Sequence, residues 1–446
     1  MSAGARRNWL WYATRCGILA AAALAFPMAG YSRGRVLGPT ATLTAANGVE
    51  IGYSAASSAD GTVMVVGAPN TTISGVTSAG AAYVFLEPAS GWSATPVQSV
   101  RLSAFTPQQS ANLGESVAIS SDGSTIVVGA PSDNAGLGAA YVFHEPTGGW
   151  SSVASESQNI TLTASDGVAN DMFGISVGMD ATGTTVIVGA EYHTVTVGTA
   201  EDTQAGAAYI FTAPSGSWSQ AAELTASDAT AYSDFGVSVA IRSATAVVGS
   251  PSHTVGSNAD QGAAYVFTPS GTSWSQAAEL AATGGAAGDY FGTSVATSGT
   301  TAVVGAPGAS SSQGAAYVFT ASSWSQVVAL TASGATSGNF LGQSVAISAD
   351  GSTIVAGAPG APPASTGSYS QGTMYQFDQP SRGKTTLPWG NETQTDTFQF
   401  SKSAQTSPAN FGVAAAVGLA TGNSWVFAGA PGTGTSQGTA YVFSGK

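Results

Sequence analysis

The sequence predicts an all-β protein, a seven-bladed β-propeller with four antiparallel strands in each blade and a last blade closed by an N-terminal strand. Three observations lead to this fold. The phrase Gly-Ala-Pro, or a close variant of it, recurs along the chain, and we call its glycine the corner. A run of β-branched residues precedes each corner, and a short aromatic strand follows it. A four-stranded unit repeated in this way is typical of propellers. The corners lie at Gly67, Gly129, Gly189, Gly249, Gly305, Gly357 and Gly429.

Each repeat begins with an apolar residue, a glycine and a short strand, as in LGESVAI at residues 113–119. A turn such as SSDG, in which Asp and Gly supply the tight hairpin, leads to the second strand. The second strand, such as STIVV before Gly129, is apolar on both faces, as expected where a strand is covered on both sides. The small side chains of these two strands fit positions near the propeller axis.

A third strand of the type GAAYVF follows each corner after a loop of variable length, with its two aromatic residues on one face. In five repeats a tryptophan opens the fourth strand, and we expect it to cover the outer edge of the blade. Stacking on a sugar is the alternative role for these side chains. They are Trp92, Trp150, Trp218, Trp274 and Trp324.

The two ends of the chain are predicted to meet in one blade. The last repeat begins at Phe411, and the chain ends after its third strand. TATLTA at residues 40–45 supplies the missing strand, which closes the ring and removes open sheet edges. The propeller is therefore expected at 40–446, after an export segment at 1–30 and a linker at 31–39. Residues 378–397 are expected to form an insert in blade six, ahead of a fourth strand in TFQFSKS.

The N-terminus has the pattern of a signal peptide, with basic residues ahead of the apolar run CGILAAAALAF. The pair Arg6 and Arg7 leaves twin-arginine export open. Cys16 is the only cysteine and lies in this segment, so a mature chain would have no disulfide and no Cys metal site. We expect a secreted protein, extracellular or periplasmic, whose mature domain does not insert into a membrane.

The mature chain is predicted to be strongly acidic. Five of the eleven basic residues and none of the 24 acidic ones lie in the first 35 positions, which leaves six basic residues in the rest of the chain. Such a domain repels nucleic acid, because it offers no basic stripe to neutralise phosphates. We therefore expect no nucleic-acid partner.

The paired phrases Phe-Gly and Gly-Ala-Pro resemble the FG-GAP repeat, and the resemblance covers residues 40–446. The chain is similar to the N-terminal propeller of integrin α-subunits and, more closely, to FG-GAP proteins secreted by bacteria. The resemblance implies the propeller fold. It says less about function, because propellers host many unrelated activities.

Integrin-like repeats often carry a Ca²⁺ loop of the type D-x-D-x-D-G-x-x-D in the first hairpin. Here each of these hairpins holds one acid at most, whereas Ca²⁺ needs six to eight oxygen ligands. We expect the single acids to form turns, so no cofactor is firmly implied, although calcium stays an alternative at other loops. These acids are Asp60, Asp122, Asp180 and Asp350.

The resemblance also implies that the loops before each Phe-Gly and after each corner emerge on one face, where integrin-like propellers bind partners. A rigid scaffold that presents variable loops usually binds something. The corner loops of blades three and four are the most promising part of this face. The predicted ligand-binding residues are Glu191, Tyr192, His193, Glu201, Asp202, His253 and Asp260.

Metal binding is predicted in the same two blades. His193 and His253 each lie four residues after a corner, so we expect adjacent blades to bring the two imidazoles close enough to share a divalent cation. The loops before Phe-Gly add two carboxylate pairs that could bind Ca²⁺ weakly. The alternative is that blade duplication copied a solvated loop whose acids cap turns. The pairs are Asp166 with Asp171 and Asp228 with Asp234.

Motifs of catalysis are sparse. The chain has three histidines and no G-x-S-x-G elbow, HExxH helix or Walker loop. We expect a monomeric, non-enzymatic binding or adhesion module that presents its loops to an extracellular protein or cell-surface partner. A carbohydrate-binding lectin is the first alternative. An enzyme acting on polysaccharides is the second, because the acids of a ring can supply a carboxylate pair by chance.

Overall fold

The computed structural model describes residues 35–45, 50–92, 100–158, 160–197, 200–202, 204–271, 273–361, 372–382, 385–386, 388–390, 396–398, 410–420, 423–432 and 438–445. The chain divides into two compact units, residues 1–32 and 33–446, and all described residues belong to the second. The predicted export segment at 1–30 lies outside the described residues. Within these ranges no helix has the length and hydropathy needed to cross a membrane.

In the described residues the second unit contains seven blades, each built on four antiparallel strands with the first strand nearest the axis. Blade one contains β3 (Ala55–Ser57), β4 (Val63–Ala68), β5 (Ala81–Leu86) and β6 (Val100–Ala104). Blade two contains β7 (Ser116–Ile119), β8 (Thr125–Ala130), β9 (Ala139–His144) and β11 (Ile160–Leu162). Blade three contains β12 (Ser176–Met179), β13 (Thr185–Ala190), β16 (Ala207–Thr212) and β17 (Ser219–Leu224).

The remaining blades repeat this order. Blade four contains β18 (Ser238–Arg242), β19 (Thr245–Ser250), β20 (Ala263–Ser270) and β21 (Ser273–Leu280). Blade five contains β22 (Ser294–Thr297), β23 (Thr301–Ala306), β24 (Ala315–Thr320) and β25 (Ser325–Leu330). Blade six contains β26 (Ser344–Ile347), β27 (Thr353–Ala358), β28 (Thr373–Asp378) and β31 (Asp396–Phe398). Blade seven contains β32 (Ala415–Ala420), β33 (Asn423–Ala430), β34 (Thr439–Gly445) and β2 (Ala41–Leu43).

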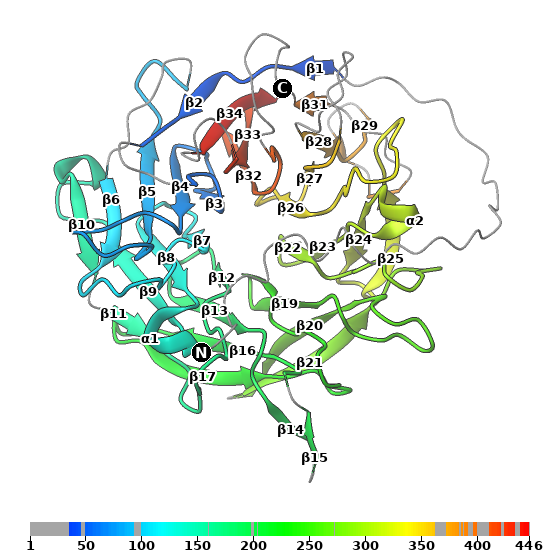
Figure 1. The fold of residues 1–446 in the computed structure, drawn as a ribbon. Coiled ribbons are helices and arrows are strands. Elements are labelled where there is room, and N and C mark those ends of the chain that lie inside the picture. Colours follow the sequence, from blue (N-terminus) through cyan, green and yellow to red (C-terminus); the bar gives the residue numbers. More distant parts are fainter. Residues whose placement is uncertain are drawn as a thin grey trace. The chain divides into compact units, whose positions relative to one another are not determined.

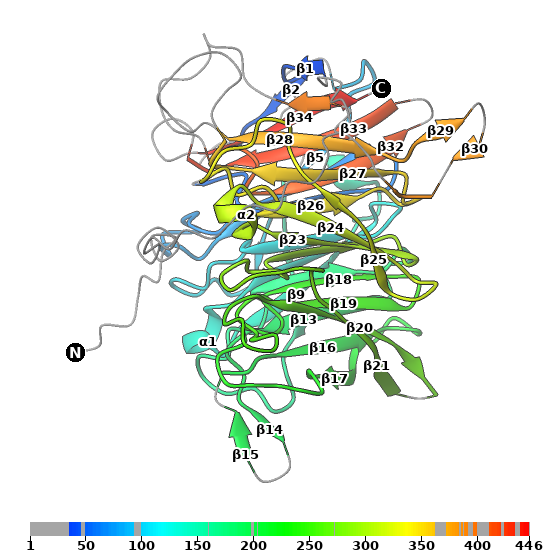
Figure 2. The same cartoon turned by 90° about the vertical axis from the view of Figure 1, so that its right-hand side faces the viewer.

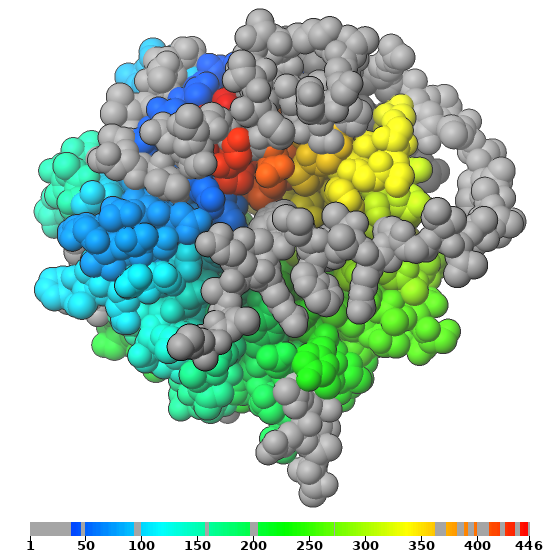
Figure 3. Space-filling model, viewed as in Figure 1, coloured from blue at the N-terminus to red at the C-terminus, as the bar shows by residue number. Residues whose placement is uncertain are grey.

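The seven sheets form a closed ring, which confirms the predicted fold. The first strands contact one another in the order β3, β7, β12, β18, β22, β26 and β32, and β32 contacts β3 again (Figure 1). The blades follow one another around the ring in sequence order, so the blue and red ends of the propeller are neighbours in Figure 3. Small apolar residues of the first strands, such as Ala118, Gly178 and Ala240, line a central cavity of about 200 Å³.

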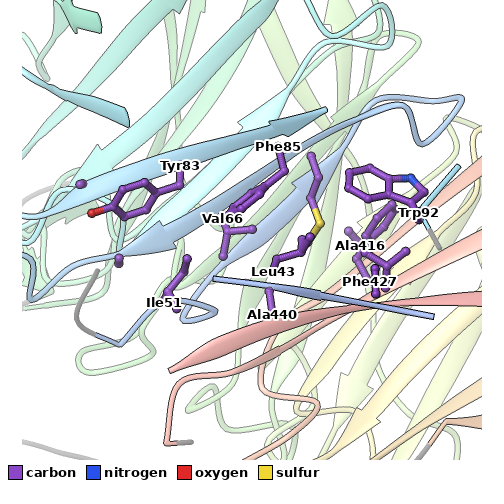
Figure 4. Close-up of a cluster of buried hydrophobic side chains, with 14 of the residues drawn as sticks. Leu43, Ile51, Val66, Tyr83, Phe85, Trp92, Ala416, Phe427 and Ala440 are labelled. Atoms are coloured by element: carbon purple, nitrogen blue, oxygen red, sulfur yellow. The ribbon is translucent and has the colours of Figure 1, made fainter. Parts of the chain in front are cut away.

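The N-terminal strand closes the last blade, as predicted. β2 pairs antiparallel with β34, with Leu43 opposite Ala440 in the register, and the Thr40 N–H donates to the carbonyl of Val442 at 2.7 Å. Leu43 is fully buried in a cluster that also takes Tyr83 and Phe85 from blade one and Phe427 from blade seven (Figure 4). The head and tail of the chain therefore share one hydrophobic core.

Two glycines join each blade to the next, and a serine joins them in blades one to six, whereas blade seven has Ala414 instead. Each repeat begins with an apolar residue and a glycine, such as Phe173 and Gly174, which we call the apolar-Gly pair. The corner glycine packs against the glycine carbonyl of this pair in the next blade. A Cβ on Gly129 would lie 2.0 Å from the oxygen of Gly174. Gly174 has φ of 96° and donates its N–H to Gly189 of its own blade at 2.9 Å. The hydroxyl of Ser116 donates to the same Gly174 oxygen at 2.9 Å. The repeated phrase therefore encodes the contact between neighbouring blades.

The tryptophans divide into two groups. Trp92 and Trp150 are fully buried and donate their indole N–H to the hairpin carbonyls of Gly61 and Gly123, at 3.0 and 2.9 Å. This confirms the predicted edge-covering role for these two. Three others are half-buried and pack against the core of their blades: Trp218, Trp274 and Trp324.

Two predicted boundaries need correction. The expected linker contains β1 (Arg35–Leu37), which pairs parallel with β31 as a fifth strand of blade six. The insert at 378–397 is more than a loop, because Trp389 is buried in the core and donates to the carbonyl of Gly351 at 3.2 Å, as Trp92 and Trp150 do in their blades. The insert also contains the short pair β29 (Ser381–Arg382) and β30 (Thr385–Thr386). Thr397 and Phe398 belong to the fourth strand, as predicted, and the rest of TFQFSKS lies outside the described residues.

Some short elements extend beyond the four-stranded plan. β10 (Ser155–Gln158) pairs parallel with β6 at the edge of blade one. The hairpin of β14 (Val195–Val197) and β15 (Ala200–Asp202) extends away from the ring (Figures 1 and 2). The single turns α1 (Asp133–Gly136) and α2 (Ala309–Ser312) both lie in loops that follow a corner, and both contain residues with positive φ. The short 3₁₀ helix η2 (Trp150–Ser152) lies near the outer edge of blade two.

Candidate functional site: the loop face and two Asp-His-Glu clusters

One face of the ring gathers two sets of loops, which we call the loop face. The leading loops precede the apolar-Gly pairs and span 105–112, 163–172, 225–234 and 281–290 in blades two to five. The corner loops follow the corners and span 131–138, 191–206, 251–262 and 307–314 in the same blades. Each corner loop lies beside the leading loop of the next blade, through bridges such as Gly138 with Phe173 and hydrogen bonds such as Met172 N–H to Gly136 at 3.0 Å. α1 and α2 mark this side in Figure 2.

The first cluster lies on this face in blade three. His193 of the corner loop is buried, and its Nε2 faces a carboxylate oxygen of Asp166 at 4.0 Å and one of Glu223 at 3.9 Å. Asp166 comes from the leading loop, and Glu223 comes from β17. The other ring nitrogen, Nδ1, lies 2.8 Å from Oδ2 of Asp171. The His193 ring also stands edge-on to Tyr209, which fixes its orientation.

The second cluster repeats this arrangement in blade four. Nε2 of His253 lies 3.3 Å from a carboxylate oxygen of Asp228, and Glu279 of β21 completes the group. The hydroxyl of Tyr265 donates to Asp228 at 2.9 Å, and the His253 ring stands edge-on to this tyrosine. In both clusters the three candidate ligand atoms lie within 4.8 Å of one another.

Burial and like charge act on the acids of both clusters. Burial and the neighbouring Asp166 carboxylate raise the pKa of Glu223, and His193 partly offsets this. Burial and the Asp228 carboxylate raise the pKa of Glu279 in the same way, with His253 opposing the rise. A cation among these groups would relieve the repulsion.

The predicted sharing of one cation by His193 and His253 is wrong in this geometry. Each imidazole faces the outer strand and the leading loop of its own blade. The leading loop of blade four lies between the two corner loops, where the Phe235 N–H donates to Ala205 at 3.0 Å. The structure thus forms two separate clusters in place of one shared site.

The two predicted carboxylate pairs also differ from each other. Asp166 and Asp171 both face His193, so the structure brings this pair together around one side chain. Asp228 belongs to the second cluster, whereas Asp234 accepts a hydrogen bond from Ser252 at 2.6 Å and does not join it. The counterpart of Asp171 in blade four is Ser233, two residues before the phenylalanine of the apolar-Gly pair.

The remaining predicted face residues lie around these clusters. Glu191 is half-buried, and burial, together with Asp234 and Glu115, raises its pKa to about 8 against a hydrogen bond from Tyr192. The carbonyl of Asp260 accepts from the Tyr290 N–H at 3.0 Å, which ties a corner loop to the next leading loop. Glu201 and Asp202 lie in β15, and their side chains fall outside the described residues.

The hairpin acids form turns. Asp122 accepts the Ser120 hydroxyl at 2.6 Å and the Ser124 N–H at 3.0 Å, and these bonds hold its pKa below the usual range. Asp60 and Asp350 make the same contacts in their hairpins.

Sequence reasoning did not find Glu223 and Glu279. A signal existed, because both occupy the same position in the phrase QAAEL, opposite the tyrosine of the third strand. Blade five has Ala329 at this position and Ala309 in place of the histidine. The histidine and the glutamate therefore occur together or not at all in these three blades.

A comparison with protein-family models matches five FG-GAP repeats, at residues 97–143, 157–211, 218–267, 274–319 and 324–377, more than half of the chain. The chain belongs to the FG-GAP repeat family. Each matched FG-GAP unit starts at the fourth strand of one blade and ends at the third strand of the next, as 157–211 does with β11 and β16. The family repeat is thus offset from the blade by one strand. The chain shows the same offset, because its N-terminal strand β2 is the fourth strand of blade seven. A search of curated proteins found no match.

Proposed function

We propose that this FG-GAP protein is a non-enzymatic, extracellular or periplasmic binding module, which acts as a monomer and presents its loop face to a protein at a cell surface. One observation carries the proposal. Phe105, Val168 and Tyr232 are 71, 57 and 61% exposed, and all three lie in leading loops of consecutive blades. Large apolar side chains exposed together on one face are typical of protein-binding surfaces.

The charge of the face favours a partner with a basic surface. Glu115 and Glu191 lie close enough to interact, with Glu50 and Asp234 beside them, and burial together with this crowding of acids raises the pKa of Glu191 to about 8. A cationic group of a partner would favour the ionised forms of these acids. Complementary charge speeds association and selects among partners, whereas the exposed aromatic residues supply most of the affinity.

The scaffold suits this role because the loops rest on a rigid ring. The leading and corner loops are joined by backbone hydrogen bonds, such as Asn112 N–H to Ser78 at 3.1 Å and Gly288 N–H to Ala259 at 3.0 Å. Loops held in this way lose little conformational freedom on binding.

The proposal is tested by retention of the purified full chain on whole cells and by cross-linking of the bound surface protein. Replacement of the exposed aromatic residues, Phe105→Ser with Tyr232→Ser, is expected to lower retention at least tenfold. Val327→Ser is the matched control, because Val327 is 36% exposed on the outer strand β25, away from the loop face. Equal retention of the double variant and the control would contradict the proposal.

A carbohydrate-binding function is the second candidate, and a specific groove favours it. The groove, of about 530 Å³, lies beside β11 and β17 and is lined by half-buried Trp218 with Thr161, Ser165 and Gln220. An aromatic ring among hydroxyl and amide groups is suited to a sugar, whose faces are apolar and whose edges form hydrogen bonds. Binding on a glycan array that is lost in Trp218→Ala and kept in the Phe105→Ser, Tyr232→Ser variant would favour this function over the first.

A further inference from the structure

We propose that the Asp-His-Glu clusters are two independent binding sites for a divalent transition-metal ion of the zinc type. In blade three the ligands are Asp166, Nε2 of His193 and Glu223. In blade four they are Asp228, Nε2 of His253 and Glu279. Neither the family match nor the proposed binding function requires these sites.

The geometry of the ligand atoms is close to that of a metal site. Zinc binds histidine nitrogen and carboxylate oxygen at about 2.0–2.2 Å in a tetrahedron, which places its ligand atoms about 3.3–3.6 Å apart. The three atoms of each cluster lie within 4.8 Å of one another. In blade four the Nε2 atom is already 3.3 Å from Asp228. Small rotations of the carboxylates therefore suffice to close the site.

The histidines are held as metal ligands usually are. His193 and His253 are only 8 and 4% exposed. Nε2 of His193 has its two carboxylate neighbours at 4.0 and 3.9 Å, beyond hydrogen-bond distance, whereas Nε2 of His253 lies 3.3 Å from Asp228. A buried imidazole nitrogen that faces two carboxylates beyond hydrogen-bond distance, as in blade three, is suited to a cation between them. In blade three, Asp171 at Nδ1 completes the carboxylate–histidine pair that orients metal-ligating imidazoles.

The blades without a histidine serve as an internal comparison. At the positions of Asp166, His193 and Glu223, blade five has Gly284, Ala309 and Ala329. Blade six has Gly334, Ala361 and Thr397 at these positions. The fold keeps the same strands in all four blades, so the three side chains are not needed to build a blade. Their joint presence in blades three and four and joint absence in five and six favours one common role.

The donor set selects the class of metal. One imidazole and two carboxylates suit zinc and its neighbours, whereas Ca²⁺ prefers six to eight oxygen ligands. Three protein ligands leave a fourth position open. Since Asp166 and Asp228 are 44 and 43% exposed, that position faces solvent on the loop face.

The two sites are expected to differ in affinity. Nδ1 of His253 is buried without a hydrogen-bond partner, because Ser233 occupies the position of Asp171 and donates its hydroxyl to Thr230 at 2.7 Å. Loss of such an outer partner typically lowers metal affinity 10–100-fold. The blade-four site is therefore the weaker of the two.

Titration with Zn²⁺ alone, by isothermal calorimetry on the full chain after treatment with EDTA and gel filtration, tests the sites. We expect two ions per chain, one in His193→Ala, one in His253→Ala and none in the double variant. His144→Ala is the matched control and should keep two ions, because His144 is exposed on β9 outside both clusters. Blade five carries alanine, Ala309, at the position of His193 and His253, so the substitution is compatible with the fold. Circular dichroism verifies that each variant folds. Absence of zinc binding in the wild type, or equal stoichiometry in wild type and a folded double variant, would overturn the proposal.

A second pair of variants separates coordination from surface charge. Asp171→Asn is expected to weaken the blade-three site about 10–100-fold, and Ser233→Asp is expected to strengthen the blade-four site, measured in the His253→Ala and His193→Ala backgrounds respectively. Addition of 1 mM Ca²⁺, a concentration of the order used by extracellular calcium modules, should not displace zinc from either site. If Ser233→Asp leaves the affinity of the blade-four site unchanged, the inference that a carboxylate at position 233 orients His253 is wrong. If Ca²⁺ displaces zinc, the assigned class of metal is wrong.

Discussion

Gly189 at the corner of blade three packs directly against Gly236 of blade four, and a Cβ on Gly189 would lie 1.9 Å from the Gly236 carbonyl oxygen. The hydroxyl of Ser176 donates to the same oxygen at 2.6 Å, so the contact excludes both a larger side chain and a shift of the backbone. The same pair of glycines recurs around the ring, as at Gly305 and Gly342, where the distance would be 2.0 Å.

Substitution of a corner glycine should therefore separate two blades. We expect Gly189→Ala to destabilise the protein by at least about 3 kcal/mol, because the new methyl group meets backbone that cannot rotate away. Urea unfolding followed by tryptophan fluorescence measures the change. Gly38→Ala is the control, since a Cβ there meets nothing within 4 Å, and it should change stability by less than about 0.5 kcal/mol. A Gly189→Ala protein as stable as the control would show that the corner tolerates a side chain.

Closure of the ring by β2 leads to a second prediction. Leu43→Ala is expected to cost about 2–5 kcal/mol, because Leu43 is fully buried between blades one and seven. Deletion of residues 40–46 should abolish the sharp thermal transition, since it leaves β34 as an open edge. Thr42→Ala is the matched control on the same strand, where the side chain is only half-buried. A cooperative melt of the deletion variant would mean that the ring does not depend on the N-terminal strand.

The two groups of tryptophans should respond differently to truncation. Trp150→Ala is expected to cost about 3–5 kcal/mol, because the indole is buried and its N–H bond to Gly123 is lost. Trp274→Ala should cost clearly less, since this side chain is half-buried at the edge of blade four. Denaturant midpoints of the two variants provide the comparison, and equal losses would remove the distinction between the groups.

The fold was predictable from sequence because its determinants repeat. The corner glycines, the apolar-Gly pairs and the AYVF strands each occur in blade after blade, and the Thr40–Ala45 strand completes a unit that the chain leaves open. β1 was missed because Arg35–Leu37 is too short to show a strand pattern. Trp389 was missed as a core residue because the insert shifts it out of the spacing seen at Trp92 and Trp150.

The candidate site was predictable only in part. His193, Asp166 and Asp228 stand out as rare residues in loops, whereas Glu223 and Glu279 lie in strands whose alternation predicts only an outward position. The spacing of residues in the sequence also does not show that one loop lies between two others in the fold. The path of residues 225–234, between the corner loops of blades three and four, decides that the histidines form separate clusters.

The pH dependence of stability is the last prediction, and it concerns Glu191 and Glu115 on the loop face. Burial, followed by Asp234 and Glu115, raises the pKa of Glu191 to about 8, and burial raises that of Glu115 to about 7, with a hydrogen bond from Tyr53 opposing the rise and Glu50 adding to it. In the unfolded chain both groups ionise near their ordinary pKa of 4.5.

The sign of the effect follows from these values. The folded protein holds protons that the unfolded chain releases, so the stabilisation is complete below pH 4.5 and is lost as the pH rises toward 8. We expect the free energy of unfolding to fall by at least about 2 kcal/mol between pH 5 and pH 8, and Glu191→Gln to remove a large part of this slope. Urea unfolding at intervals of half a pH unit measures it, with Glu156→Gln on the edge strand β10 as the control that should keep the wild-type slope. Parallel pH profiles for Glu191→Gln and the wild type would show that the loop-face acids do not hold these protons.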